Sequence, residues 1–261
     1  MMSGELKNVV GNITNYTPAI SVIIPTKNRP AMLKRAILSV LAQDFNDYEI
    51  IIIDDGNGEG AVLARGMNIE KIRVFSSGYA GQISARNQAI ANANGEYLAW
   101  LDDDDWWEPF HLQQIAVAMR NSQFIYASGW IAYENEQQEC GEILPFSAYA
   151  SAVSLRKNNT LLWSGGAYPR NFHHQYGLFD DNFTHYFDWD WYLRLAGADI
   201  CFVATPHSSV WISARENSVS SAQNESARRI ELDILQSKHG LQNIPLKNHA
   251  GIAQEQAAKS K

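Results

Sequence analysis

Four consecutive carboxylates, Asp102 to Asp105, are the residues whose types and spacing most directly suggest chemistry in this chain. They follow a short apolar run, Tyr97 to Leu101, and precede two indoles, Trp106 and Trp107. Crowding ionised carboxylates at the edge of a low-dielectric core is costly, and a divalent cation relieves that cost. Oxygen ligands suit Mg²⁺ or Mn²⁺ better than zinc or copper. A solvated acidic turn is the alternative, but a buried strand directly before the run favours a metal site.

The spacing within the acidic run predicts which carboxylates act together. In an extended segment successive side chains point to opposite faces, so Asp102 and Asp104 would point the same way. We therefore expect these two residues to share one metal ion or one ligand.

The elements that must position this run are indicated by apolar patterns in the first hundred residues. Short β-branched and apolar runs predict strands at 19–24, 49–53, 72–75 and 97–101. The run at 49–53 is continuous rather than alternating, as in a parallel sheet covered on both faces. Helical spacing follows at 33–41 and 83–91, with Asn28 as the expected N-cap of the first helix. This order predicts a doubly wound α/β fold in which loops at the carboxyl ends of the strands form one crevice.

The later chain gives weaker signals. We expect helices at 112–119 and 188–196, strands at 124–127 and 200–203, and a late helix around Ile230 to Leu235. The Gly-, Ser-, Asn- and Trp-rich stretch up to Arg170 predicts irregular, substrate-facing structure. The tail after Gly251 predicts disorder.

Length and composition exclude several classes of protein. The chain has 261 residues, a formal net charge of −7 and a pI near 5.5, which suit one large α/β domain and no nucleic-acid partner. Two cysteines without metal spacing fit a reducing compartment. The polar start and the lack of a membrane-length apolar run predict a soluble, cytoplasmic protein.

Several segments together resemble a known pattern, that of family 2 glycosyltransferases. The first three are Val22 to Arg29, Glu49 to Gly56 and Ala85 to Asn87. Leu101 to Trp107, Gly177 to Asp181 and Asp188 to Leu195 continue the same order. The resemblance covers roughly residues 19–206, and its motifs are specific because they occur together and in sequence.

The resemblance implies a GT-A fold: a Rossmann-like, mostly parallel central sheet with flanking helices and a small acceptor-side β region. It divides the chain into a lead-in (1–18), a catalytic domain (19–220) and a C-terminal helix and tail (221–261). Within the catalytic domain, 19–107 would bind the nucleotide sugar and 108–220 the acceptor.

The resemblance also implies roles on the donor side. The metal ligand would be Asp104, with Asp103 as the alternative or further ligand because the register of the run is open by one residue, and Mn²⁺ or Mg²⁺ would be the cofactor. Asp55 would accept a hydrogen bond from the nucleotide base, with a turn-forming aspartate as its alternative role. Arg86 would lie near the diphosphate, or act as a structural partner of the acidic run. The expected nucleotide-binding set is Pro25, Thr26, Arg29, Asp55, Arg86, Asp102 and Asp103.

On the acceptor side, the resemblance assigns the catalytic base to Asp188. Phe187 stands where the family has a glutamate. Its apolar character and the loss of a like charge act on the Asp188 pKa in opposite directions, so we predict no net shift. Asp190 is the rival base. Trp163, Gly165 and Gly166 are expected to shape the sugar pocket, where an indole can stack on a sugar face.

These implications predict an inverting, metal-dependent transferase that moves a sugar, most simply from a UDP-sugar, to a hydroxyl. The acceptor would be a glycan or lipid-linked glycan of cell-surface polysaccharide biosynthesis, reached at the inner face of the membrane by peripheral contact. Two alternatives stay open: a sugar nucleotidyltransferase, and a binding protein that has lost catalysis. Neither the sugar nor the oligomeric state follows from the sequence.

Overall fold

The computed structural model describes residues 17–119, 123–135, 137–215 and 224–259. Most of the predicted lead-in, 1–16, lies outside these ranges. The large sheet runs in the order β10-β6-β9-β4-β1-β2-β3 across its seven strands. These strands are β1 (Ile20–Thr26), β2 (Tyr48–Asp54), β3 (Ile72–Ser76), β4 (Tyr97–Trp100), β6 (Gln123–Tyr126), β9 (Gly166–Pro169) and β10 (Cys201–Ala204).

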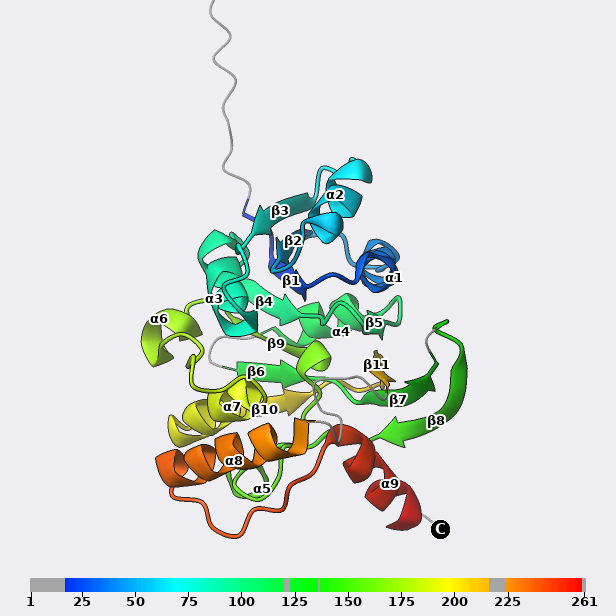
Figure 1. The fold of residues 1–261 in the computed structure, drawn as a ribbon. Helices are drawn as coiled ribbons and strands as arrows, with labels where there is room; N and C mark the ends of the chain where they lie inside the picture. The colour runs from blue at the N-terminus through cyan, green and yellow to red at the C-terminus, as the bar shows by residue number, and fades with distance from the viewer. Residues whose placement is uncertain (1–16, 120–122, 136, 216–223, 260–261) are drawn as a thin grey trace, which may run out of the picture.

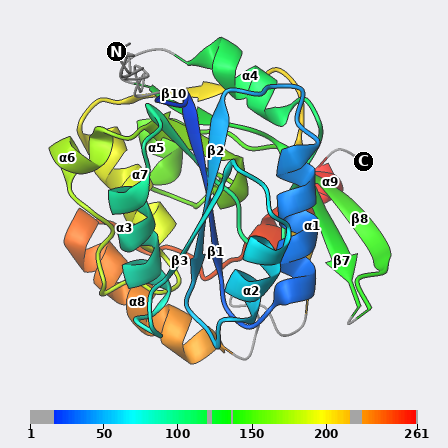
Figure 2. The same ribbon diagram turned by 90° about the horizontal axis from the view of Figure 1, so that it is seen from above.

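The helices lie on both sides of this sheet (Figures 1 and 2). They are α1 (Pro30–Leu41), α2 (Glu59–Gly66), α3 (Gln82–Asn92), α4 (His111–Ala118), α5 (Ala152–Leu155), α6 (Phe172–Tyr176), α7 (Phe187–Gly197), α8 (Glu225–His239) and α9 (His249–Lys259). Side chains of β1 and β2 alternate between two buried clusters, with Ile23 and Ile51 on the α3 and α7 side. Val22 and Ile50 lie on the α1 side. A sheet covered on both faces explains the continuous apolar runs.

The predicted GT-A architecture is confirmed in its main features. Strand β1 pairs in parallel with β2 and β4, and β2 pairs with β3. Strand β9 is antiparallel to β4 and β6, so the sheet is mixed at that position. The predicted irregular region up to Arg170 thus contributes a central strand, because burial of Ala167 and Tyr168 outweighs its glycine-rich composition.

A second, four-stranded sheet forms the small β region, in the order β5-β11-β7-β8. Its strands are β5 (Trp106–Trp107), β11 (Val210–Ala214), β7 (Gly129–Glu134) and β8 (Cys140–Phe146). The sequence predicted none of these strands individually. Strand β5 is two residues long, and β8 is largely exposed, so neither carries a strong apolar pattern.

The disorder predicted after Gly251 is wrong. Helix α9 packs against β8, with Ile252 and Ala253 buried, and the Gln256 amide exchanges two hydrogen bonds with the backbone of Ser147. The predicted N-cap is also wrong: Asn28 adopts φ 55°, and its side chain accepts a hydrogen bond from Asn57 N instead. Among the described residues, no helix combines the length and apolar character needed to cross a membrane.

Candidate active site

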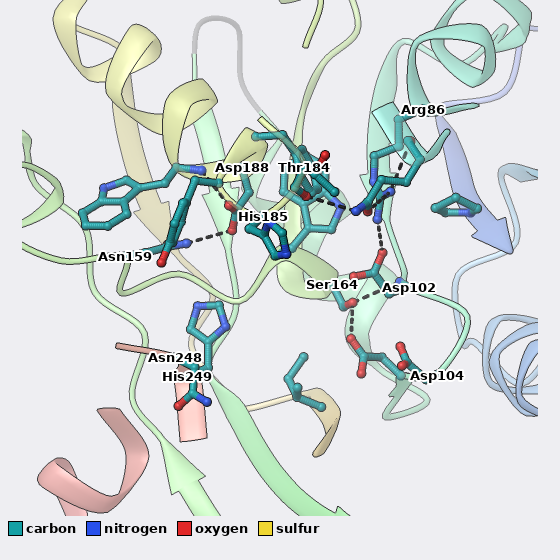
Figure 3. Close-up of a pocket in the computed structure, with 18 of the residues that line it drawn as sticks. Arg86, Asp102, Asp104, Asn159, Ser164, Thr184, His185, Asp188, Asn248 and His249 are labelled. Carbon is teal, nitrogen blue, oxygen red and sulfur yellow. Dashed lines mark hydrogen bonds and ion pairs between the residues drawn. The ribbon is translucent and has the colours of Figure 1, made fainter. Parts of the chain in front are cut away.

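One cavity of about 260 Å³ lies at the carboxyl ends of β1, β2 and β4. Three parts of the chain line it: the strand ends of the large sheet, the segment that leads into α7, and the region around α8 and α9. The side chains used below are Thr26, Lys27, Arg29, Asp55, Gln82, Arg86, Asp102, Asp103, Asp104, Asp105, Asn159, Trp163, Ser164, His185, Asp188, Arg228, Lys247, Asn248 and His249. Figure 3 shows the facing carboxylates of Asp188 on one wall and Asp102 and Asp104 on another.

The acidic run forms a turn rather than an extended strand. Strand β4 ends at Trp100, and Asp105 N donates a hydrogen bond to Asp102 O at 3.0 Å. The prediction that Asp102 and Asp104 share a face because the segment is extended is therefore wrong. Each carboxylate of the run instead has its own set of partners.

Two of the four carboxylates are structural supports. Asp103 accepts from Thr26 Oγ1 at 2.7 Å and pairs with Arg29 at 2.5 Å. Burial raises the Asp103 pKa to about 7, and neighbouring carboxylates add to the shift. Asp105 accepts from Ser164 Oγ at 2.5 Å and from Ser213 N at 2.9 Å. Its pKa is raised well above its ordinary value, first by burial.

The other two carboxylates of the run are more exposed. The Asp102 side chain is 32% exposed and pairs with Arg86 Nη2 at 2.6 Å. Burial and the Asp104 charge raise the Asp102 pKa, while Arg86 opposes the shift. The Asp104 side chain is 18% exposed, and its Oδ2 atom pairs with Arg29 at 2.7 Å and with Arg215 at 3.5 Å. Arg215 follows β11 and had no sequence signal.

The donor set around Asp104 fits a divalent cation held jointly with a ligand. Within the described ranges, no group of three or more His, Cys, Asp or Glu side chains is arranged to hold a metal alone. Mg²⁺ is usually bound by one or two carboxylates together with substrate phosphates. In the described part of the chain, the hydrogen bonds and ion pairs of the Asp104 carboxylate all fall on Oδ2, and Arg35 donates to its backbone carbonyl. The partly exposed carboxylate therefore has an oxygen to offer.

Arg86 is a structural partner of the acidic run that also lines the cavity, and its place near a diphosphate stays a prediction. It lines the cavity, it pairs with Asp102, and its guanidinium lies 4.5 Å above the centre of the Phe187 ring. Phe187 also packs edge-on against Trp163 at 5.0 Å. The phenylalanine that replaces the expected glutamate is thus a buried support for a cavity-lining cation.

Asp55 faces the cavity but is already engaged on one oxygen. Its Oδ1 atom accepts from Ser77 Oγ at 2.5 Å and from Gly81 N at 3.0 Å, which holds the loop between β3 and α3. Its Oδ2 atom pairs with Lys27 at 3.2 Å, and the Lys27 side chain is 53% exposed. A ligand donor can therefore reach Oδ2 by displacing the exposed Lys27 ammonium group. Pro25 and Thr26 also line this end of the cavity.

Asp188 lies in the first turn of α7 and is buried. Its Oδ2 accepts from Asn159 Nδ2 at 2.8 Å, and its Oδ1 accepts from Trp189 N at 2.7 Å. Burial raises the Asp188 pKa to about 6, although both hydrogen bonds oppose that shift. Desolvation thus outweighs the two hydrogen bonds, and the expected balance between the apolar character of Phe187 and the loss of a like charge stays a prediction.

Asp190, the rival base, does not line the cavity. Its side chain is fully buried and pairs with Arg194 at 2.9 Å, Lys238 at 2.7 Å and His239 at 2.8 Å. The histidine and lysine hydrogen bonds lower its pKa against the effect of burial. Asp190 therefore joins α7 to α8, and Arg194 is its structural partner.

Of the predicted sugar-pocket residues, only Trp163 lines the cavity. Its ring is 5% exposed and packs on Trp100 at 4.9 Å, so the indole is mainly a core side chain. A Cβ atom on Gly165 would lie 3.1 Å from Ala127 O, and one on Gly166 would lie 2.9 Å from Phe124. Close packing directly before β9 and at its first residue therefore favours glycine at both positions.

The C-terminal region supplies cavity residues that sequence reasoning missed. Arg228 is buried on α8 and donates to Lys247 O at 2.6 Å. Lys247, Asn248 and His249 line the same cavity at the start of α9, and burial lowers the His249 pKa to about 4. No local motif marks these residues, because only the packing of α8 and α9 brings them to the strand ends.

Comparisons with known proteins agree with this geometry. Residues 21–173 match the family model described as glycosyl transferase family 2. An uncharacterized glycosyltransferase of Bacillus subtilis, YwdF, is 32% identical over 248 residues, which are 92% of this chain and 91% of that protein. Escherichia coli WcaA, provisionally named a colanic acid biosynthesis glycosyl transferase, is 32% identical over 153 residues, 54% of each chain.

Solved structures show the same fold at low sequence identity. Staphylococcus aureus TarS has a TM-score of 0.59 at 15% identity, over 84% of this chain but only 39% of that one. A shorter form of TarS, residues 1–349, was solved in complex with UDP-GlcNAc. It gives a TM-score of 0.58 at 16% identity and covers 84% of this chain and 66% of its own.

Proposed function

This chain belongs to glycosyl transferase family 2, and we propose that it is an inverting, metal-dependent enzyme that transfers one sugar from a UDP-sugar to a hydroxyl. The family makes it a glycosyltransferase. The observation that carries the finer proposal is that one cavity holds Asp188 on one wall and Arg86, Asp102 and Asp104 on another. A base and an anion-binding wall across one space suit displacement at a sugar carbon.

In the proposed reaction, Asp188 accepts the proton of the acceptor hydroxyl as that oxygen attacks the anomeric carbon. The new bond forms on the face opposite the nucleoside diphosphate, so the bond from that carbon to the phosphate oxygen breaks and the configuration inverts. Asn159 and Trp189 N orient the carboxylate. Its raised pKa makes it a better proton acceptor than an ordinary exposed aspartate.

The anionic donor would lie against the opposite wall. Arg29 and Arg86 supply positive charge, and Asp55 offers Oδ2 to a base N–H. A Mg²⁺ or Mn²⁺ ion would be held by Asp104 with help from Asp102, and when bound it neutralises charge on the leaving diphosphate. TarS was solved with UDP and with UDP-GlcNAc, which makes UDP-sugars the first donors to test.

For the acceptor, we propose only a class of compound. A cell-surface glycan or lipid-linked glycan agrees with the name of the E. coli relative, which refers to colanic acid biosynthesis. Action in the cytoplasm, at the inner face of the membrane, is part of the same proposal. The alternative of a sugar nucleotidyltransferase is dropped, because the matching family model and the relatives are glycosyltransferases.

The test is a product assay with UDP-, GDP-, CDP- and dTDP-sugars, each with Mn²⁺ and with EDTA. Release of one nucleoside diphosphate that requires metal is the expected result, with a product of inverted anomeric configuration by NMR. Retention of configuration, or equal turnover in EDTA, would contradict the corresponding part of the proposal. Binding of UDP without turnover in any condition would instead support the inactive binding protein.

A further inference from the structure

His185 lines the cavity three residues before Asp188, and the proposed reaction so far gives it no role. The segment that carries it is held from both sides. Gln82 Nε2 of α3 donates to Thr184 O at 3.0 Å, and His185 N donates to Glu231 Oε2 of α8 at 2.6 Å. The backbone of His185 is therefore fixed between the donor-side wall and the C-terminal region.

Glu231 also fixes the imidazole ring. His185 Nδ1 lies 2.8 Å from Glu231 Oε1, and the two side chains are only 12% and 13% exposed. An ionised carboxylate can only accept, so Nδ1 carries the proton in this contact. In the neutral ring, Nε2 then has a lone pair and no proton. A single carboxylate thus determines both the direction of the ring and its tautomer.

The lone pair of Nε2 is available to a ligand. Within the described ranges, the hydrogen bonds of His185 are those of its backbone N and of Nδ1 with Glu231. Figure 3 shows the His185 ring at the edge of the space between Asp188 and His249. A ligand group in that space would meet Nε2 as an acceptor of hydrogen bonds.

The chemistry of Nε2 selects the kind of group it binds. Phosphate oxygens at neutral pH are acceptors, and a lone pair facing them would be unfavourable, whereas a hydroxyl can donate. The arginines that suit a diphosphate, Arg29 and Arg86, come from the other wall. His185 comes from the same short segment as Asp188, the group proposed to meet the acceptor. The matching ligand is a hydroxyl of the acceptor.

We propose that His185 Nε2 accepts a hydrogen bond from a second hydroxyl of the acceptor sugar, beside the hydroxyl whose proton passes to Asp188. Glu231 is its positioning residue. This inference rests on the proposed transferase function and narrows its acceptor to a polyhydroxy compound. No bond is made or broken at His185, so its contribution is to acceptor binding and orientation.

The experiment compares three acceptors with UDP-GlcNAc as the donor: water, methanol and a panel of methyl glycosides. His185→Phe keeps an aromatic ring but removes Nε2. Glu231→Gln removes the carboxylate that keeps the proton of His185 on Nδ1. His174→Gln, at an exposed histidine of α6, is the control. The rise in melting temperature with UDP reports that each variant is folded.

In His185→Phe, the ratio of transfer to methyl glycosides over hydrolysis should fall about tenfold, mainly through acceptor KM, because one hydrogen bond is lost. The ratio for methanol, which has a single hydroxyl, should not fall. Glu231→Gln should give a smaller loss in the same direction, and His174→Gln none. Equal losses with water, methanol and glycosides, or an unchanged glycoside ratio, would overturn the proposal.

A second measurement does not need turnover. In ¹⁵N-histidine NMR, the ring signals that disappear in His185→Phe are those of His185. In the wild type these signals should show a protonated Nδ1 and an unprotonated Nε2. Glu231→Gln should change that tautomer ratio. An Nε2–H tautomer in the wild type would overturn the inference. A wild type that neither hydrolyses nor transfers any nucleotide sugar would instead contradict the proposed function, and the two failures are thereby distinguished.

Discussion

Asp188 sets the expected pH dependence of the proposed reaction. Burial raises its pKa to about 6, so the carboxyl is protonated below that pH and cannot take up the acceptor proton. We predict that kcat/KM for transfer falls about tenfold per pH unit below about pH 6 and levels off above it. The wild-type pH profile measures this. A constant rate down to about pH 4.5 would argue against Asp188 as the base.

The two aspartates of α7 should respond differently to the same substitution. Asp188→Asn should reduce transfer by about 10²- to 10⁴-fold while UDP still raises the melting temperature, because only proton transfer is removed. Asp190→Asn should instead lower the free energy of unfolding by about 2 kcal/mol or more, since it weakens the pairing of a buried carboxylate with Arg194 and Lys238 and its contact with His239. Steady-state kinetics and denaturant unfolding of both variants test the assignment, and the reverse pattern would exchange the roles.

Asp55 makes a third prediction at this scale. Asp55→Ala removes Oδ2, proposed to meet the nucleotide base, and also Oδ1, which holds Ser77 and Gly81 N. We expect nucleotide preference among UDP, GDP and CDP to weaken by about tenfold or more. Ser77→Ala is the matched control, because it disturbs the same loop without removing the carboxylate. An equal loss of preference in both variants would make Asp55 structural.

Elements of the first hundred residues could be predicted because their patterns are local. The isoleucine runs of β1 and β2 are buried on both faces, and each ends in polar residues at the same sheet edge. The turn at Asp102 to Asp105 could not be predicted, since its partners Thr26, Ser164 and Ser213 are distant in sequence. The same reason hid β9 and the short strands of the small sheet.

Helix α9 shows how a weak local pattern can still form a defined element. Ile252 is 5% exposed and packs into the core on the α1 side of the sheet. Ile252→Ala should lower the free energy of unfolding by about 2–4 kcal/mol. Ala258→Ser, on an exposed position of the same helix, should change it by less than about 0.5 kcal/mol. Denaturant titration of both variants checks this, and equal stabilities would show that α9 contributes no packing.

For the whole molecule, the cavity is the feature that joins distant parts of the chain. Thr26 ends β1, and Arg29 lies in the loop that follows this strand. Asp188 lies on α7, and Lys247 and His249 belong to the C-terminal region. The cavity residues at the strand ends and Asp188 could be named from the sequence because their motifs are contiguous. Sequence reasoning missed Arg215, Arg228 and the C-terminal residues Lys247 to His249, because only the folding of the chain brings these residues close to the strand ends.

The most direct test of the central claim, that this cavity binds a nucleoside diphosphate through a metal at the acidic turn, is a thermal-shift panel. UDP, GDP, CDP and dTDP are each added with Mn²⁺ and with EDTA, to the wild type and to Asp104→Ala. A ligand that binds only the native state raises the melting temperature by mass action. We predict that UDP stabilises the wild type with Mn²⁺, and that EDTA or Asp104→Ala removes most of the shift. The account would be contradicted if none of the four nucleotides stabilises the protein, or if the shift with UDP survives both EDTA and Asp104→Ala. Asp102 to Asp105 would then be an acidic turn with a structural role and no metal site.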